Sequence, residues 1–318
     1  MKETRTGRTV SRSAKNKAFQ RFRSNFELTL LTIPALILFL LFHYAPMFGI
    51  VLAFKNYRYD KGIFGSDWVG FQNFEFFFTS QDALRITRNT VGYSLTFMIV
   101  GTLAGLFIAL LLFEIVKAKM ATKFYQTTMI LPRFLSWVVV GFITYAILNP
   151  TQGVLNQALG LIGIEPIQWY SDPKYWPVIL TIVNLWNGVG MGSIIYFAGL
   201  MGVEKEQLEA AEIDGAGRFK KALHISLPAL IPLVVILNIL AFGGLFSGDF
   251  GLFYQIPRNI GGLYPTTDII NTYVFRGLRS GNIGMTAAVG FFQSFVGLVL
   301  VVAANSIVRK ISPDHSLF

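Results

Sequence analysis

Carboxamide and indole side chains recur inside long apolar stretches of the chain, and they are the residues best suited to bind a ligand. Placing a polar side chain in lipid costs free energy unless the group is hydrogen-bonded or hydrated. Each of these side chains is therefore expected to contact a polar partner, a ligand or water. Carboxamides can bind the hydroxyls of a sugar, and an indole ring can cover its C–H face. The competing interpretations are helix–helix hydrogen bonding and, for Trp, exposure to lipid. The candidates are Trp137, Asn184, Trp186, Asn187, Asn238 and Gln293, of which Asn187 and Asn238 fit best.

Residues for catalysis or metal binding are not grouped in this sequence. The chain has no Cys, and its three His residues lie in different segments, at His43, His224 and His315. No Ser/His, paired Asp or His/Glu set lies within the predicted membrane spans. The sequence therefore shows no catalytic residues for an intramembrane enzyme. No G-x-x-x-x-G-K-[ST] sequence is present either, so the chain cannot hold ATP phosphates in a P-loop.

The elements that must position these side chains are membrane helices. The chain is 53% hydrophobic and only 14% charged, whereas soluble domains carry about 25% charged residues. A spanning helix needs about 20 mostly apolar residues. Six runs meet this length, which predicts an all-α integral membrane protein: Glu27–Phe54, Asn89–Val116, Phe124–Leu148, Pro177–Met201, Leu227–Phe246 and Ile283–Val308.

The distribution of basic residues predicts the orientation of these spans. A net charge of +10 could indicate nucleic acid, but the basic residues crowd at the N-terminus and at the ends of the apolar runs. One side receives 17 of the 27 Lys and Arg residues and the other receives nine. The positive-inside rule then places both termini and residues 202–227 in the cytoplasm. The expected divisions are a basic tail at 1–25, a transmembrane domain at 26–310 and a cytoplasmic C-terminal tail at 311–318.

A charged loop at 202–227 is the longest polar segment on the cytoplasmic side. Val203–Ile213 is rich in good helix formers. Gly215 permits a reversal of the chain, and a second short helix follows that carries Phe219 and Leu223 on one face. Pro228 is tolerated in the first turn of the next span. The loop should form a bent helix pair with a small apolar ridge, a shape that can lie in a groove on a soluble partner.

The loop also carries a spaced motif. Glu209-Ala210-Ala211, Gly215 and Ile225-Ser226-Leu227-Pro228 match each fixed position of the E-A-A-x3-G-x9-I-x-L-P loop. Asp214 and Ala216 complete a D-G-A core around Gly215. The chain therefore resembles the membrane-spanning permeases of ABC importers, over roughly residues 26–310. The 126–140 segment and Asp268–Val274 are similar to the permeases of complex-carbohydrate importers, alginate importers among them.

The resemblance implies a MetI-like permease fold in the bacterial inner membrane. It also implies a second homologous permease, two ATP-binding subunits, an extracytoplasmic binding protein and an oligosaccharide substrate. No cofactor is expected on this chain, since ATP and Mg²⁺ would be bound by the ATPase. The ATPase-docking residues implied by the family are Glu209, Ala210, Ala211, Asp214, Gly215, Ala216 and Phe219.

Two alternatives to this assignment are an ion-coupled secondary transporter and a channel. A secondary transporter should carry acidic residues deep in its spans, but no Asp or Glu lies in the middle third of any predicted span. No segment resembles the filter loop of a channel. Arg133 lies about two turns into the third run, and it either snorkels to the interface, pairs with another subunit or binds an anionic substrate. Asp249, Asp268, Arg276 and Arg279 are expected to be solvated charges on the outer side.

Overall fold

The computed structural model describes residues 26–311, so the tail predicted at 1–25 and all of the tail predicted at 311–318 except Ile311 lie outside the described residues. The chain divides into two compact units, one ending at Leu52 and the other beginning at Ala53. The described residues contain five helices long and apolar enough to cross a membrane, or six spans when one bent pair counts as a single span. The all-α membrane fold predicted from the sequence is confirmed.

The first unit contains a single apolar span. It begins with α2 (Phe26–Phe39), continues as the π-helical turn η1 (Leu40–Tyr44), and passes into the 3₁₀ segment η2 (Ala45–Phe54), whose end lies in the second unit. Pro34 lies inside α2 and Pro46 near the start of η2. Prolines disturb regular α-helical winding, and these two lie close to the changes in winding.

The segment between the first two spans is folded. A two-residue antiparallel pair, β1 (Lys55–Asn56) with β2 (Asp67–Trp68), encloses the short helix α3 (Gly62–Gly65). Its register places Lys55 opposite Trp68. The helix α4 (Gln72–Thr79) follows, and Ser80 then caps the long helix α5 (Gln81–Glu114) by accepting a hydrogen bond from the Ala83 amide.

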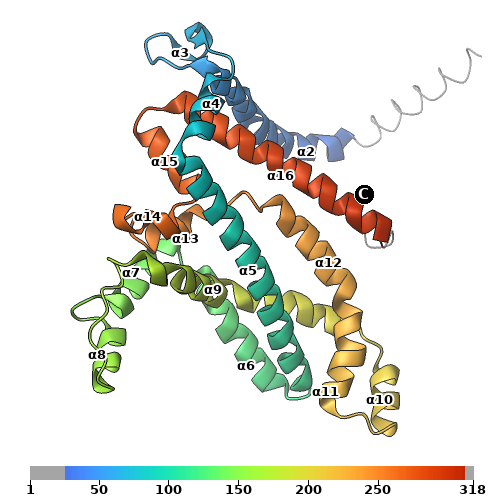
Figure 1. The fold of residues 1–318 in the computed structure, drawn as a ribbon. Helices are drawn as coiled ribbons and strands as arrows, with labels where there is room; N and C mark the ends of the chain where they lie inside the picture. Colours follow the sequence, from blue (N-terminus) through green and yellow to red (C-terminus); the bar gives the residue numbers. More distant parts are fainter. Residues whose placement is uncertain (1–25, 312–318) are drawn as a thin grey trace, which may run out of the picture. The chain divides into compact units, whose positions relative to one another are not determined.

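The remaining helices of the second unit are shown in Figure 1. The α5–α9 pair makes the most extensive helix–helix contact, and α12 packs against α16. In chain order the elements after α5 are α6 (Lys119–Ile130), η3 (Leu131–Phe134), α7 (Trp137–Leu148), α8 (Val154–Leu161), η4 (Pro173–Tyr175), α9 (Trp176–Leu200), α10 (Lys205–Ile213), α11 (Arg218–Lys221), η5 (Ala222–Ser226), α12 (Leu227–Gly243), α13 (Phe250–Gln255), η6 (Gly261–Leu263), α14 (Tyr264–Thr267), α15 (Ile270–Arg279) and α16 (Ile283–Ile311).

The third apolar run is not a straight helix, which corrects the prediction of one continuous span over Phe124–Leu148. The segments on either side of the break meet at an angle of 99°. The 3₁₀ turn η3 contains Pro132, and Ser136 then starts α7 anew by accepting a hydrogen bond from the Val139 amide. A proline followed by an N-cap serine ends one helix and begins another.

The interior of the second unit contains three apolar clusters. The largest lies where α7, α9 and α13 meet and includes the fully buried Trp176, Leu252 and Ile256. A second joins the start of α5 to α15 and α16 through Ile86 and Ile270. The third joins α5, α9 and α12. These clusters fix the long helices around the polar groups described below.

Asp268 and Arg276 are not solvated charges, which corrects a second prediction. The Asp268 side chain is fully buried, and its Oδ2 lies 2.6 Å from Nη2 of Arg276 and 3.1 Å from Nη2 of Arg85. Thr272 donates a further hydrogen bond to Oδ1. The Arg276 guanidinium lies 4.2 Å from the centre of the Tyr264 ring. This cluster binds α5 to α15 across 183 residues of sequence.

Candidate functional site

A cavity of about 250 Å³ lies between α5, α9 and α12. Asn184 of α9 and Asn238 of α12 both line it, so two of the six predicted ligand residues come together. Gly101, Gly188 and Gly192 give it room, because they place no side chain on its walls. Its volume lies just below the usual range of ligand pockets, about 300–1,000 Å³.

The polar groups of this cavity differ in how far they are already paired. Asn238 donates from Nδ2 to the Val234 carbonyl at 2.8 Å and accepts at Oδ1 from Thr102 at 3.4 Å. The Asn184 carboxamide makes no hydrogen bond with any described residue. Tyr196 and Thr102 complete the polar lining and were missed by the sequence analysis. Both are polar groups inside long apolar helices, so the signal that selected Asn184 also applied to them.

Asn187 is placed differently from Asn238, although the sequence favoured the two equally. It is buried, and its Nδ2 donates to the Pro132 carbonyl at 2.9 Å. Its Oδ1 accepts from Nη1 of Arg133 at 3.1 Å. Both ends of the carboxamide therefore fasten α9 to the break in the third run. Asn187 and Arg133 form a brace between these segments, and neither lines the cavity.

The other three predicted ligand residues are dispersed. Trp137 donates from Nε1 to Oδ2 of Asp249 at 2.9 Å, next to α13. Gln293 of α16 donates to Oδ1 of Asn271 on α15 at 3.1 Å. Trp186 is 43% exposed on α9. The structure therefore does not gather these three with Asn184 and Asn238.

Residues 202–227, the docking loop, form the predicted bent helix pair. The helix α10 ends in a Schellman motif, in which the Ala216 amide donates to the Ala211 carbonyl at 2.8 Å and the Gly215 amide to the Glu212 carbonyl at 3.1 Å. Gly215 has a φ of +77°, the left-handed conformation that this motif requires. Asp214 is the C-cap residue. Five of the predicted docking positions therefore lie in or beside one turn: Ala210, Ala211, Asp214, Gly215 and Ala216.

Charged pairs hold the docking loop in shape. Lys221 of α11 lies 3.1 Å from Oε2 of Glu212 on α10 and joins the two short helices. The hydrogen bond from Lys221, and then its charge, lower the pKa of the Glu212 carboxyl below its ordinary value. Arg218 lies 3.5 Å from Glu114 at the end of α5. Figure 1 shows α10 and α11 at the same end of the second unit as the turn from α5 into α6.

The outward face of the docking loop is apolar at its centre. Ile213 is 87% exposed and Phe219 is 79% exposed. Glu209 is also exposed and makes no hydrogen bond or ion pair with a described residue. Large apolar side chains at full exposure on a polar loop indicate an interaction surface. Among the described residues no group of His, Asp and Glu could hold a metal ion.

Comparison with known proteins identifies a family. Residues 101–314 match the family described as the binding-protein-dependent transport system inner membrane component. The chain is 36% identical to the protein LplB of Bacillus subtilis, with 90% of each chain covered. It is 34% identical to the polygalacturonan/rhamnogalacturonan transport system permease protein YteP of the same organism, covering 90% of this chain and 89% of YteP.

A solved structure resembles the chain over nearly its whole length. It belongs to a bacterial ABC transporter involved in the import of the acidic polysaccharide alginate. The TM-score is 0.85 at 30% sequence identity, with 93% of this chain and 99% of that chain covered. A second structure, of an alginate ABC transporter in complex with a periplasmic protein bound to alginate pentasaccharide, has a TM-score of 0.83.

Proposed function

Because the chain belongs to the family of binding-protein-dependent transport system inner membrane components, we propose that it carries an oligosaccharide through the α5–α9–α12 cavity, driven by an ATPase that holds the docking loop. The chain is the transmembrane subunit of an ABC importer and is not itself an enzyme. This family assignment removes the alternative of an ion-coupled secondary transporter. An oligosaccharide is supported by relatives that import polygalacturonan, rhamnogalacturonan and alginate.

The partners follow from the same family. A second, homologous permease forms the other half of the path, and two ATP-binding subunits hold ATP and Mg²⁺. An extracytoplasmic binding protein delivers the sugar, as the periplasmic protein does in the alginate importer complex. Both termini and the docking loop face the cytoplasm, which places the loop on the side where ATP is available. Residues 1–25 and 311–318 are the two cytoplasmic tails.

The observation that carries the coupling step is the geometry of the docking loop. Gly215 and the ion pair between Lys221 and Glu212 fix two short helices at an angle, with Ile213 and Phe219 exposed. A groove on the ATPase can receive this ridge, with Glu209 at its edge. The π-helical turn η5 continues directly into α12, which contributes Asn238 to the cavity. Movement of the docking loop therefore reaches the sugar path through one helix.

In the cavity, Asn184 is the first group to engage the substrate. Its carboxamide is free to donate to one sugar hydroxyl and to accept from another. Asn238 already accepts from Thr102 through a long hydrogen bond of 3.4 Å, which a sugar hydroxyl can replace. The Tyr196 ring supplies a flat wall beside them.

The test uses the complex of this chain with its partner permease and ATPase in lipid. Binding protein loaded with each of a panel of neutral and acidic oligosaccharides is added, and ATP hydrolysis is measured. We expect one class of sugar to stimulate hydrolysis, and we expect the double variant Asn184→Ala/Asn238→Ala to lose most of this stimulation. Ser306→Ala is the matched control, because among the described residues that hydroxyl bonds only to its own helix, at the Val302 carbonyl. Stimulation by no sugar, or equal stimulation in the double variant, would contradict the proposal.

A further inference from the structure

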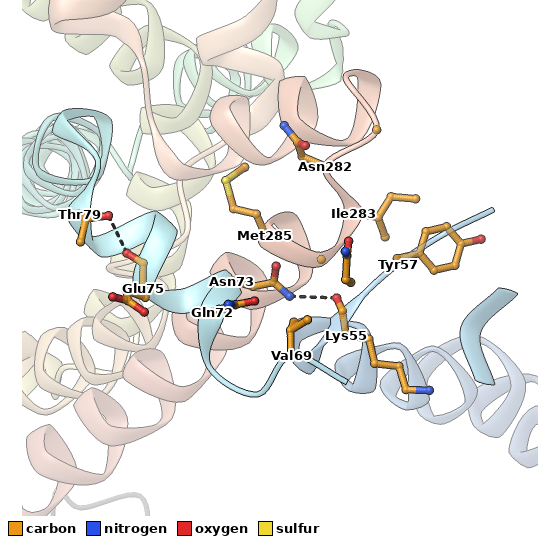
Figure 2. Close-up of a pocket in the computed structure, with 13 residues that line it drawn as sticks. Lys55, Tyr57, Val69, Gln72, Asn73, Glu75, Thr79, Asn282, Ile283 and Met285 are labelled. Carbon is orange, nitrogen blue, oxygen red and sulfur yellow. Dashed lines mark hydrogen bonds between the residues drawn. The ribbon is translucent and has the colours of Figure 1, made fainter. Parts of the chain in front are cut away.

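A second cavity, of about 570 Å³, shares no lining residue with the first, and its walls come from residues 55–79 and 281–285. Figure 2 shows that its walls come from β1, from α4 with the residues before it, and from the turn between α15 and α16. All of these segments belong to the second unit. In the proposed orientation they face the outer side, where no ATPase is present.

The frame of this outer cavity is held by hydrogen bonds and close backbone contacts. Asn73 donates from Nδ2 to the Ala53 and Lys55 carbonyls, at 2.9 and 3.0 Å. At Gly284 the first turn of α16 approaches so closely that an added Cβ would lie 2.7 Å from the Lys55 carbonyl oxygen and 2.8 Å from Nδ2 of Asn73. The strand, α4 and α16 are therefore fastened at one point, and the walls of the cavity are formed before any ligand arrives.

The lining of the outer cavity is rich in carboxamides. Asn56, Gln72, Asn73 and Asn282 contribute four, and Tyr57 adds an aromatic ring. The side chains of Asn56, Gln72 and Glu75 make no hydrogen bond with any described residue, so their donors and acceptors are free for a ligand. Val69, Ile283 and Met285 supply apolar surface between these groups. Groups that both donate and accept, beside a ring and short apolar patches, match the alternating O–H and C–H surface of a sugar.

The charge of the lining selects against anions. Lys55 is the only cationic residue among the lining residues, and its ammonium is bound to the Ile63 and Phe64 carbonyls at 2.9 and 2.8 Å. It is 4% exposed, and Figure 2 shows its side chain directed away from Glu75. The carboxylate of Glu75 has no ion-pair partner among the described residues. A carboxylate or phosphate here would meet the Glu75 carboxylate, while the Lys55 ammonium is already bound by two carbonyls.

We infer that this outer cavity is a second carbohydrate site, which takes a neutral glycosyl unit of one or two rings and rejects uronates. It is separate from the transport path and binds sugar without ATP or the binding protein. The inference rests on the proposed function only for the orientation, which gives this face access to extracytoplasmic sugar.

The experiment measures binding of two probes, cellobiose and digalacturonate, to the whole complex in lipid nanodiscs without nucleotide or binding protein. Saturation-transfer NMR titrations give the Kd. We expect saturable binding of cellobiose at millimolar concentration and at least tenfold weaker binding of digalacturonate. The double variant Gln72→Ala/Asn282→Ala should raise the Kd for cellobiose at least tenfold. Asp60→Asn is the matched control, since Asp60 lies on the same outer segment, pairs with Arg58 and does not line the cavity.

A charge variant tests the selectivity. Glu75→Gln keeps the hydrogen-bonding shape and removes the negative charge, so digalacturonate should then bind within about threefold of cellobiose. Absence of cellobiose binding, equal Kd values for the two probes in the wild type, or an unchanged Kd in the Gln72→Ala/Asn282→Ala variant would each overturn the inference. Weakened association with the binding protein at an unchanged Kd for cellobiose would show a protein-docking surface and would also overturn it. Stimulation of the ATPase by loaded binding protein is measured in parallel, so the proposed function can stand while this inference fails.

Discussion

At the scale of single residues, Gly215 is the position where a substitution should affect function through the backbone conformation alone. Its φ of +77° lies in the left-handed region, and apart from the glycine itself and its two chain neighbours no described residue has an atom within 4 Å of the place a Cβ would occupy. A β-branched residue there is strained by about 1–2 kcal/mol through its backbone only. We expect Gly215→Val to abolish sugar-stimulated ATP hydrolysis while the protein still inserts into the membrane.

The matched variant for this prediction is Gly215→Asn, because asparagine tolerates the left-handed region. It should retain most of the stimulation. Sugar uptake into cells and ATP hydrolysis by the purified complex check both variants. Wild-type uptake by Gly215→Val, or equal loss in both variants, would show that the Schellman turn is not what positions the docking loop.

The Asn187 brace gives the second prediction at this scale. Asn187→Leu would leave the Pro132 carbonyl and one Arg133 donor without their partner, at a cost of about 1–3 kcal/mol. The docking loop lies elsewhere in the chain, so we expect transport to fall while the ATPase still copurifies. Loss of the ATPase from the purified complex would mean that the brace supports the whole assembly. Asn184→Leu is the comparison, since Asn184 makes no hydrogen bond with a described residue and should affect sugar stimulation without loss of thermal stability.

At the scale of elements, the docking loop should respond to pH through the ion pair of Glu212 with Lys221. The folded loop lowers the pKa of Glu212 below its ordinary value of 4.5. The pair therefore contributes its stabilisation at pH values above 4.5, and this contribution is lost as the pH falls through the lowered pKa. Hydrogen exchange of the α10 and α11 amides should show constant protection, after correction for the intrinsic rate, above that value and reduced protection below it. Glu212→Gln should remove this step, and a step that persists in that variant would assign it to another group.

The elements also show what a sequence can and cannot predict. Hydropathy gave the number of apolar runs, and the basic residues predicted an orientation, because both depend on composition within short windows. The prediction of one straight span for the third run was wrong, because the length of an apolar run does not show where the helix axis changes direction. Its 99° break is made by Pro132 and by the side chain of Ser136, which act on backbone geometry. The bent-helix shape of the docking loop was predicted correctly because its motif is local, with Gly215 six residues from Glu209, whereas its role in docking stays a prediction.

Ligand residues were harder to predict than elements. Asn187 and Asn238 have the same residue type at similar depth, yet one braces a break and the other lines a cavity. The difference is set by which helix each one faces, and a single sequence does not contain that information. Thr102 and Tyr196 could have been selected from the sequence by the criterion that selected Asn184, a polar group inside a long apolar run. The outer cavity could not be predicted in this way, because the two segments that form its walls are separated by about 200 residues of sequence.

At the scale of the whole molecule, the buried charge of Asp268 joins α5 to α15. Packing between the lipid-facing helices alone would not fix the positions of these two helices. Arg85 comes from α5 and Arg276 from α15, and both guanidiniums bind one carboxylate oxygen. The Asn89 carboxamide also donates to the Asp268 carbonyl at 2.9 Å. Such a cluster costs desolvation energy to form, but once formed it makes the position of each partner depend on the others.

Asp268→Asn should therefore destabilise the second unit. Removing the carboxylate leaves the partly exposed Arg276 guanidinium without a carboxylate partner, whereas Arg85 keeps its ion pair with Asp82 at 2.8 Å. A buried ion pair that loses one partner costs about 3–5 kcal/mol, and the side-chain exposures of 30% and 25% for Arg85 and Arg276 reduce this through screening by solvent. We expect a fall in Tm of about 5 °C for the purified complex, measured by intrinsic fluorescence. Asp60→Asn removes an exposed ion pair and should leave the Tm unchanged. Equal Tm values for the two variants would mean that the apolar clusters, and not this charge, hold α5 to α15.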